Sequence, residues 1–296
     1  MVGAMSTRQG ALFVAHGTVS DLDEIPAFLA RIRHGRPPPP ELVAETQRRY
    51  QLIGKSPLLE VTREQASRVK SRLGMPVLVG MRLSDPSVES ALEQSADLGL
   101  ERLAIVPLAP FSVHVYGAHA ERVAMGLRER GIRAPELTVA PPWGTHEALV
   151  RAHAEAIRPH LTPDTLLVLT AHSLPLSVIR GGDGYQTQVD ASARAVGVAL
   201  GASYELAYQS QGFDGGEWLG PTLNATLERA RERGVRRVAV APFGFLGEHV
   251  ETLYDLDIEA RALTDKLGLE LVRVPALGVA PGLIEALSDL VQRGHA

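Results

Sequence analysis

The chain of 296 residues contains no cysteine. This excludes disulfides, thiolate metal sites and cysteine-ligated iron–sulfur clusters. No apolar run approaches the roughly 20 residues that a membrane-spanning helix needs. Basic residues number 30 against 34 acidic ones, so the net charge of −4 leaves no excess that would favour a phosphate backbone. We therefore expect a cytoplasmic protein that binds no nucleic acid, with peripheral membrane contact left open.

Nucleotide-binding motifs are also missing. No GxxxxGK[ST] segment occurs, and neither glycine-rich stretch, 179–188 or 210–221, has the form of a dinucleotide fingerprint. Ser173 lies in HSLP rather than in a GxSxG elbow, so it has no special claim to be a nucleophile. Both glycine-rich stretches predict loops beside a site, with Tyr185 and Trp218 as candidate contacts to a large flat ligand, although such residues more often anchor their own loop.

Short apolar runs alternate with longer amphipathic ones along the whole chain. The runs predict strands near 11–16, 76–82, 102–108, 136–140, 165–171, 203–208, 236–243 and 269–274. The amphipathic segments predict helices near 23–33, 40–53, 59–73, 86–98, 116–130, 145–158, 189–200, 221–233, 249–267 and 279–293. This alternation is typical of an α/β protein with parallel sheets flanked by helices.

The pattern restarts in the second half of the chain, which indicates an internal repeat. Pro107 and Pro242 follow similar apolar strands and are separated by 135 positions (242 − 107). His114 and His249 show the same spacing (249 − 114). We therefore expect two Rossmann-like halves, each with a four-stranded parallel sheet.

The repeat divides the chain near residue 160. We assign 11–160 to an N-terminal half that includes a lid over 24–56, and 161–296 to a C-terminal half. Residues 1–10, with two methionines, are expected to be disordered or a remnant of an expression vector.

Histidines stand where two of the predicted strands end. His172 ends the apolar run VLTAH, and His16 ends the matching first strand of the other half. Ligands of parallel sheets bind at the carboxyl ends of strands, so both imidazoles are expected to face a cleft between the halves, with His114 and His249 beside them. A histidine that is merely hydrogen-bonded at a strand end is the alternative, but imidazole also exchanges protons near neutral pH.

Three carboxylates follow His249 at helical spacing. Glu251, Asp255 and Glu259 are four residues apart, which on a helix places them along one face. A solvated acidic face is the common reading of such a stripe. Because it begins beside an imidazole, it is also suited to receiving a hydrated divalent cation and passing it inward.

Arginines crowd the segment 31–50 on either side of four prolines. A charged surface segment is one reading. The other is a lid whose guanidiniums pair with ligand carboxylates, which arginine does bidentately.

Taken together, several motifs resemble the ferrochelatase family along nearly the whole chain. They are AHSLP (171–175), SQG (210–212), WLGP (218–221), PFGF (242–245) and HVETLYDLDIE (249–259). The segments 17–36 and 48–58 are similar to monomeric bacterial ferrochelatases, especially the type that acts on coproporphyrin III.

The resemblance implies a chelatase-type fold and an enzyme of haem biosynthesis. Such a lyase inserts Fe²⁺ into a porphyrin with release of two protons; coproporphyrin III is favoured and protoporphyrin IX is second. His172 matches the family's active-site histidine and Glu251 its acidic partner, whereas Asp255 and Glu259 match outer carboxylates. We take these four as metal-binding and the first two as catalytic. Whether His172 is a base or a metal ligand stays open.

The resemblance also implies residues that bind the porphyrin. Arg33 and Arg49 match residues near its carboxylates, and Ser56 and Tyr116 match cleft residues. His16, which we add to this set with Tyr185 and Trp218, stands where the coproporphyrin type carries tyrosine. No prosthetic group is expected, Fe²⁺ being a substrate. The expected partners are the porphyrin, Fe²⁺ and, transiently, neighbouring enzymes of the haem pathway, and the expected state is a monomer.

Two alternatives remain open. A first-strand histidine in AHG is similar to small chelatases that load cobalt, nickel or iron into sirohydrochlorin, and imidazole suits several of these ions. A non-catalytic haem-binding protein would instead use His16 and His172 as axial ligands.

Overall fold

The computed structural model describes residues 8–212 and 215–296. Most of the segment predicted to be disordered, residues 1–7, lies outside the described residues. Gln9 and Gly10, by contrast, already belong to the first strand, so the predicted boundary at residue 10 was too late. Among the described residues, no helix combines the length and the apolar character needed to cross a membrane.

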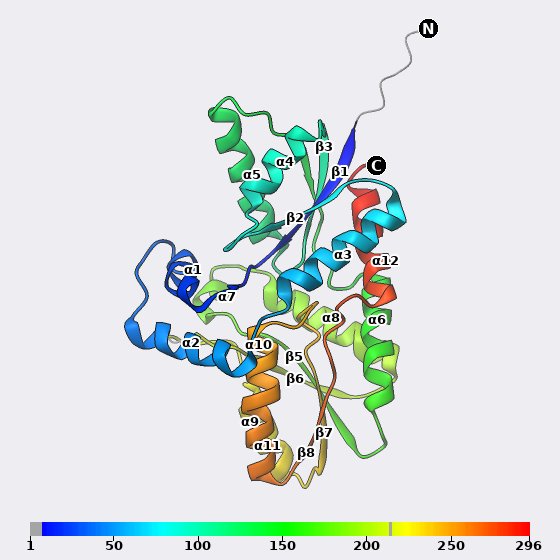
Figure 1. Cartoon of the computed structure of the whole chain (residues 1–296). Coiled ribbons are helices and arrows are strands. Elements are labelled where there is room, and N and C mark those ends of the chain that lie inside the picture. The colour runs from blue at the N-terminus through cyan, green and yellow to red at the C-terminus, as the bar shows by residue number, and fades with distance from the viewer. Residues whose placement is uncertain (1–7, 213–214) are drawn as a thin grey trace. The chain divides into compact units, whose positions relative to one another are not determined.

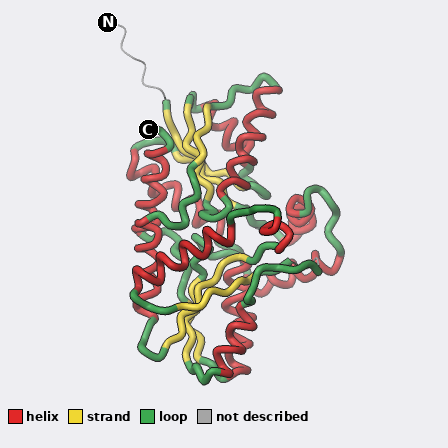
Figure 2. Tube along the Cα trace, turned by 180° about the vertical axis from the view of Figure 1, so that it is seen from behind, coloured by secondary structure: helices red, strands yellow, loops and turns green. Residues whose placement is uncertain are grey.

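The strands form two parallel sheets. They are β1 (Gln9–Ala15), β2 (Val77–Met81), β3 (Arg102–Pro107), β4 (Glu136–Val139), β5 (Thr165–His172), β6 (Tyr204–Gln209), β7 (Arg237–Ala241) and β8 (Glu270–Arg273). One sheet has the order β2-β1-β3-β4 and the other the order β6-β5-β7-β8. Figure 2 shows the strands of each sheet in yellow between red helices. The identical order of the two sheets confirms the predicted fold class and its internal repeat.

Helices connect the strands throughout. The α-helices are α1 (Ile25–Ile32), α2 (Pro40–Ile53), α3 (Leu58–Leu73), α4 (Val88–Asp97), α5 (Val113–Glu129), α6 (Glu147–Ile157), α7 (Leu176–Arg180), α8 (Tyr185–Leu200), α9 (Leu223–Glu232), α10 (Val250–Tyr254), α11 (Arg261–Leu267) and α12 (Pro281–Arg293). Two 3₁₀ turns, η1 (Leu22–Glu24) and η2 (Arg158–His160), and a π-helical segment, η3 (Asp255–Ala260), complete the set. Figure 1 gives their places.

Two predicted elements differ from the structure. The glycine-rich stretch 179–188 is largely helical, because α7 ends within it and α8 begins at Tyr185 rather than at 189. The continuous helix predicted over 249–267 is interrupted by η3, where the backbone adopts the wider π turn. The sequence pattern indicated neither the π turn nor the earlier start of α8.

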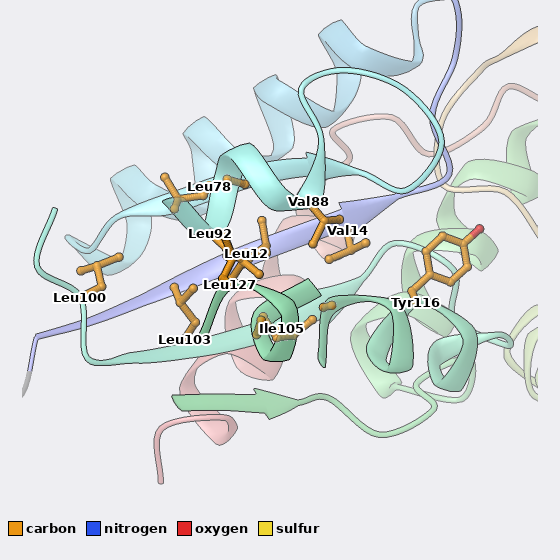
Figure 3. Packing of buried hydrophobic residues seen from close by; sticks show 13 residues of the cluster. Leu12, Val14, Leu78, Val88, Leu92, Leu100, Leu103, Ile105, Tyr116 and Leu127 are labelled. Carbon is orange, nitrogen blue, oxygen red and sulfur yellow. The ribbon is translucent and has the colours of Figure 1, made fainter. Parts of the chain in front are cut away.

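The first sheet is covered by an apolar core. Leu12 and Val14 of β1 and Leu103 and Ile105 of β3 are buried against α4 and α5, as Figure 3 shows. Their alternation along each strand points one set of side chains to this face. β1 is fully buried apart from its first residue, as expected for a central strand of a parallel sheet.

The second sheet has an equivalent core. Val168 of β5 and Val240 of β7 pack with Leu227 of α9 and with Leu256 and Ala260 of η3. The π-helical segment is therefore held to the sheet by its own apolar residues. Its acidic residues lie on the same short segment, so the packing of Leu256 and Ala260 sets their position.

The chain divides into two compact units whose boundaries differ from the predicted division near residue 160. One unit contains the chain up to Thr18, Leu59–Trp143 and the segment from Ile284, and the other contains Val19–Leu58 and Gly144–Leu283. The predicted lid, 24–56, thus belongs to the unit of the second sheet, because α2 packs on α10 through charged and aromatic contacts. The last residues return to the first sheet, where His295 Nε2 lies 2.9 Å from the Gly10 carbonyl oxygen.

Candidate active site

His172 is presented by the end of β5. The strand is buried from Leu167 to Ala171, and its last residue pairs with Gln209 of β6. The imidazole is about one-third exposed, with a side-chain exposure of 37%. The Tyr185 hydroxyl donates a hydrogen bond of 2.7 Å to the His172 carbonyl oxygen and holds the backbone behind the ring.

The turn after His172 is anchored by buried hydrogen bonds. The Ser173 amide donates to the Gln209 carbonyl at 2.7 Å, and the Ser173 hydroxyl donates to the Leu219 carbonyl at 2.8 Å. Ser173 is completely buried. Its hydroxyl therefore holds the turn together and is not presented to a ligand.

Glu251 lies between two imidazoles. Its Oε2 atom is 3.6 Å from Nδ1 of His172 and 3.4 Å from Nε2 of His249. His249 precedes α10 and packs its ring against Phe245 with the ring centroids 4.9 Å apart. In the structure the His172 and Glu251 side chains therefore lie close together, and His249 joins them.

The π turn changes how the acidic stripe is arranged. An α-helix advances about 100° per residue, so a residue four positions on lies about 40° around the axis. A π turn has more residues per turn than an α-helix. Glu259 is therefore rotated about the helix axis from Asp255 in the opposite direction to the rotation that an α-helix would give. The environments still differ, because Glu251 is half-buried, Asp255 is buried and Glu259 is exposed.

Asp255 is the most perturbed carboxyl group of this unit. Burial raises its pKa to about 7, with the charges of Glu251 and Glu259 acting in the same direction. The Ser210 hydroxyl donates a hydrogen bond to its Oδ2 atom, and a guanidinium nitrogen of Arg49 lies 3.6 Å from its Oδ1 atom. These two contacts oppose the rise in pKa but do not cancel it.

The guanidinium of Arg49 contacts other side chains of the protein. Its guanidinium donates to Glu45 at 2.8 Å and lies 4.5 Å from the centre of the Tyr254 ring. Arg48 also binds Glu45 and donates to the Tyr254 hydroxyl. Hydrogen bonds from these two arginines lower the pKa of Glu45 to about 2. Together the contacts fasten α2 to α10.

The remaining predicted substrate residues of this unit are placed differently from one another. Arg33 carries a buried Nε atom and Ser56 a buried hydroxyl, and neither has a hydrogen-bond partner in the structure. Trp218 is half-buried and stacks close to Gly212, beside the turn at Pro175. Tyr185 is only 5% exposed, and its hydroxyl is taken up by the backbone of His172.

The first unit brings together two further predicted residues. Nδ1 of His16, just beyond β1, lies 3.1 Å from the hydroxyl of Tyr116 on α5. The guanidinium of Arg82 sits 5.8 Å from the centre of the Tyr116 ring. His16 is exposed whereas Tyr116 is buried, so the imidazole is the accessible member of the pair.

Across the described residues there is no group of three or more histidine and acidic side chains close enough to enclose a metal ion. The four predicted metal ligands therefore do not form a closed site. His172 and Glu251 form one close pair, Asp255 is engaged by Ser210 and Arg49, and Glu259 is exposed.

Sequence reasoning gave no role to two polar residues of this site. Gln209 ends β6, and its side-chain amide donates to the Glu251 carbonyl at 3.3 Å. Ser210 follows it and binds Asp255. The signal that could have found them is their position, because polar residues at the carboxyl end of a parallel strand beside the His172 strand lie at the binding edge.

The fold and this strand-end site define a two-sheet α/β protein of the chelatase type. SirB from Bacillus subtilis, solved with Fe³⁺, superposes with a TM-score of 0.64 over 98% of this chain and 96% of its own, at 14% identity. The sirohydrochlorin chelatase SirB from Bacillus subtilis subspecies spizizenii, in complex with cobalt, has a TM-score of 0.61 over 97% and 95%, at 16% identity. At these identities the likeness concerns the fold.

Sequence comparison identifies the family. The Ferrochelatase family model matches residues 8–295. A ferrochelatase of Acidobacterium capsulatum is 31% identical, covering 98% of this chain and 95% of its own length. A coproporphyrin III ferrochelatase of Geobacillus kaustophilus is 32% identical, covering 95% and 94%. The chain belongs to the ferrochelatase family and is a metal chelatase.

Proposed function

We propose that the protein inserts Fe²⁺ into a porphyrin as a step of haem biosynthesis, with coproporphyrin III favoured over protoporphyrin IX. The observation that carries the proposal is the Glu251 carboxylate between the imidazoles of His172 and His249. Support for the choice of substrate comes from relatives named coproporphyrin III ferrochelatase that align along nearly their whole length.

The reaction asks for groups that take protons and hold a metal ion loosely. A porphyrin loses two pyrrole N–H protons as Fe²⁺ forms bonds to its nitrogens, so one ion enters and two protons leave. Neutral imidazole and carboxylate can each accept a proton near neutral pH, and each can also ligate a divalent ion. His172 and Glu251 are the proposed catalytic pair because Glu251 on α10 lies 3.6 Å from the imidazole that ends β5, and both side chains are about one-third exposed.

The outer carboxylates are proposed to deliver the metal. Glu259 is exposed and can meet a hydrated cation, and Asp255 lies between it and Glu251. Arg49 is 3.6 Å from Asp255, so a cation at Asp255 has to compete with this guanidinium. Oxygen ligands exchange readily, which suits transfer toward an imidazole.

Each unit by itself offers predicted substrate residues as proposed porphyrin contacts. In the second unit, the half-buried Arg33 and Trp218 are the proposed contacts, Arg33 for a porphyrin carboxylate, whereas Ser56 is buried and is proposed to act indirectly. In the first unit, the exposed His16 is the proposed contact, and the buried Tyr116 is proposed to act through its hydrogen bond to the imidazole. Arg49 and Tyr185 act mainly within the protein, so we expect their effect on the porphyrin to be indirect.

The test is an anaerobic insertion assay with coproporphyrin III, protoporphyrin IX and sirohydrochlorin, each with Fe²⁺ and Co²⁺. We expect multiple turnovers with Fe²⁺ and coproporphyrin III, and a loss of at least about 100-fold in kcat for His172→Ala. His160→Ala, on η2, serves as the matched histidine control and should keep wild-type activity.

Three outcomes would overturn the proposal. Turnover only with sirohydrochlorin would favour the reduced-tetrapyrrole chelatase, which the AHG histidine His16 suggests. Retention of one haem per chain without turnover would favour a haem-binding protein. Full Fe²⁺ insertion by His172→Ala would remove that residue from the mechanism.

A further inference from the structure

A polar clasp, formed by Gln209 and Ser210, ties the end of β6 to the acidic helix. The Gln209 amide nitrogen donates to the Glu251 carbonyl at 3.3 Å and lies 3.5 Å from Asp255 Oδ2. The Ser210 hydroxyl donates a hydrogen bond to the same Oδ2 atom. The clasp thus reaches α10 at Glu251 and η3 at Asp255, one helical turn apart.

The same clasp is joined to the strand that carries His172. Gln209 is the ladder partner of His172, and its carbonyl accepts the Ser173 amide at 2.7 Å. His172 ends β5 and Glu251 lies on α10, so the two residues are far apart along the chain. Gln209 is bound to the backbone beside each of them, so it links the imidazole and the carboxylate through two short paths.

The backbone of Ser210 indicates that its hydroxyl has a specific use. Ser210 has φ of 61°, and only His34 shares a positive φ among the non-glycine residues that the structure describes. Glycine adopts this left-handed conformation without the steric cost that a side chain brings. What a serine adds at this position is its hydroxyl, which donates to the Asp255 carboxylate and lies 3.5 Å from the Gln209 amide nitrogen.

We propose that Gln209 and Ser210 are positioning residues that set the approach of Glu251 to His172. The clasp holds the first turn of α10 against the strand ends, which keeps Glu251 Oε2 at 3.6 Å from the imidazole. This role rests on the proposed function, since the pair that is positioned is the proposed catalytic pair. Neither clasp residue needs to touch the porphyrin or the metal.

Three substitutions at Ser210 separate positioning from folding. Ser210→Thr keeps the hydroxyl but places a β-branched residue at positive φ, Ser210→Ala keeps the strain without the hydroxyl, and Ser210→Gly removes both. Among these three variants the Tm should be highest for Ser210→Gly, intermediate for Ser210→Ala and lowest for Ser210→Thr. We expect kcat to stay within about threefold of wild type for Ser210→Thr and to fall at least about tenfold for the other two, with the porphyrin KM within about twofold.

Gln209→Met removes the amide at similar size and should lower kcat as Ser210→Ala does. The matched control is Gln211→Met, because the Gln211 amide donates to the Leu219 carbonyl at 3.3 Å and not to the acidic helix. The inference is overturned if kcat ranks the three Ser210 variants in the same order as their Tm values, or if Ser210→Ala keeps wild-type kcat. It is also overturned if Gln211→Met loses as much activity as Gln209→Met.

A structural readout keeps this inference separate from the proposed function. If the wild-type protein inserts no metal into any porphyrin, the proposed function fails, and crystal structures of Ser210→Ala and Gln209→Met still test the clasp. We expect the distance between Glu251 Oε2 and His172 Nδ1 to increase beyond the 3.6 Å of the intact clasp. An unchanged distance in both variants would refute the positioning role.

Discussion

Replacing Asp255 with asparagine should make the protein more stable while making it a poorer chelatase. Asp255 is 7% exposed, and burial raises its pKa from 3.8 to about 7. Each pKa unit is worth about 1.4 kcal/mol, so this rise corresponds to about 4 kcal/mol that the fold loses when the buried carboxyl ionises.

The sign follows from the proton balance. Between pH 4 and 7 the folded protein holds a proton on Asp255 that the unfolded chain releases. The contribution of this group to the free energy of unfolding therefore falls as the pH rises through that window, and the loss is complete above it. In the Asp255→Asn variant the side chain would stay neutral at every pH and accept the Ser210 hydroxyl through its amide oxygen. The variant would lose its contact with the Arg49 guanidinium, and Arg49 would keep its ion pair with Glu45.

The assay is chemical denaturation of wild type and Asp255→Asn at several pH values from 4 to 8. We expect the free energy of unfolding of the variant, relative to wild type, to rise by up to about 4 kcal/mol across this range. Subtracting wild type removes every other titration that the two proteins share. Asp265→Asn, an exposed carboxylate on α11, controls for the loss of one charge and should show no such rise.

A difference that stays flat with pH, or a variant less stable than wild type at pH 8, would refute the reasoning. Metal insertion by Asp255→Asn should fall at least about tenfold, because the delivery path loses its middle carboxylate. A gain in stability with a loss of activity is the pattern of a group retained for function.

Two further predictions concern other buried groups of this unit. His153 lies on α6 against the Phe243 ring, and burial lowers its pKa to about 4. The stability that this neutral imidazole contributes above pH 6.5 should therefore be lost as the pH falls from 6.5 to 4, by up to about 3 kcal/mol. His153→Leu should remove this acid sensitivity, and an identical acid loss in the variant would count against it. Tyr185→Phe removes the hydroxyl that donates to the His172 carbonyl, which should cost about 1 kcal/mol of stability and lower kcat more than KM. Tyr204→Phe on edge strand β6 is the matched control, and equal effects in both variants would contradict the positioning of His172 by Tyr185.

Much of the fold could be predicted because it depends on local patterns of apolar and polar residues in the sequence. Each apolar run followed by an amphipathic segment became a strand and a helix, and the spacing shared by Pro107 and Pro242 indicated two similar halves, which the structure shows as two sheets of the same strand order. His16 and His172 were found by the same means, since a strand end can be located wherever its apolar run stops. The motif resemblance then named the family that the comparisons identify.

Other features depended on contacts between distant segments. The sequence pattern indicated neither the π turn at Asp255 nor the helical start at Tyr185, because the π-helical segment takes its place through packing on the second sheet. The role of Arg49 depended on which unit α2 packs against, and the chain order suggested the other one.

The sequence by itself determined the parallel sheets, their repetition and the residue types at the strand ends, because hydrophobic periodicity and strand length are local properties. Only the tertiary structure decided that Glu251 lies between His172 and His249, and that Asp255 is buried against Ser210. Those placements follow from the packing of η3 on the second sheet and from the clasp at the end of β6. Burial and distance are what change proton affinity, and both arise only when these segments meet.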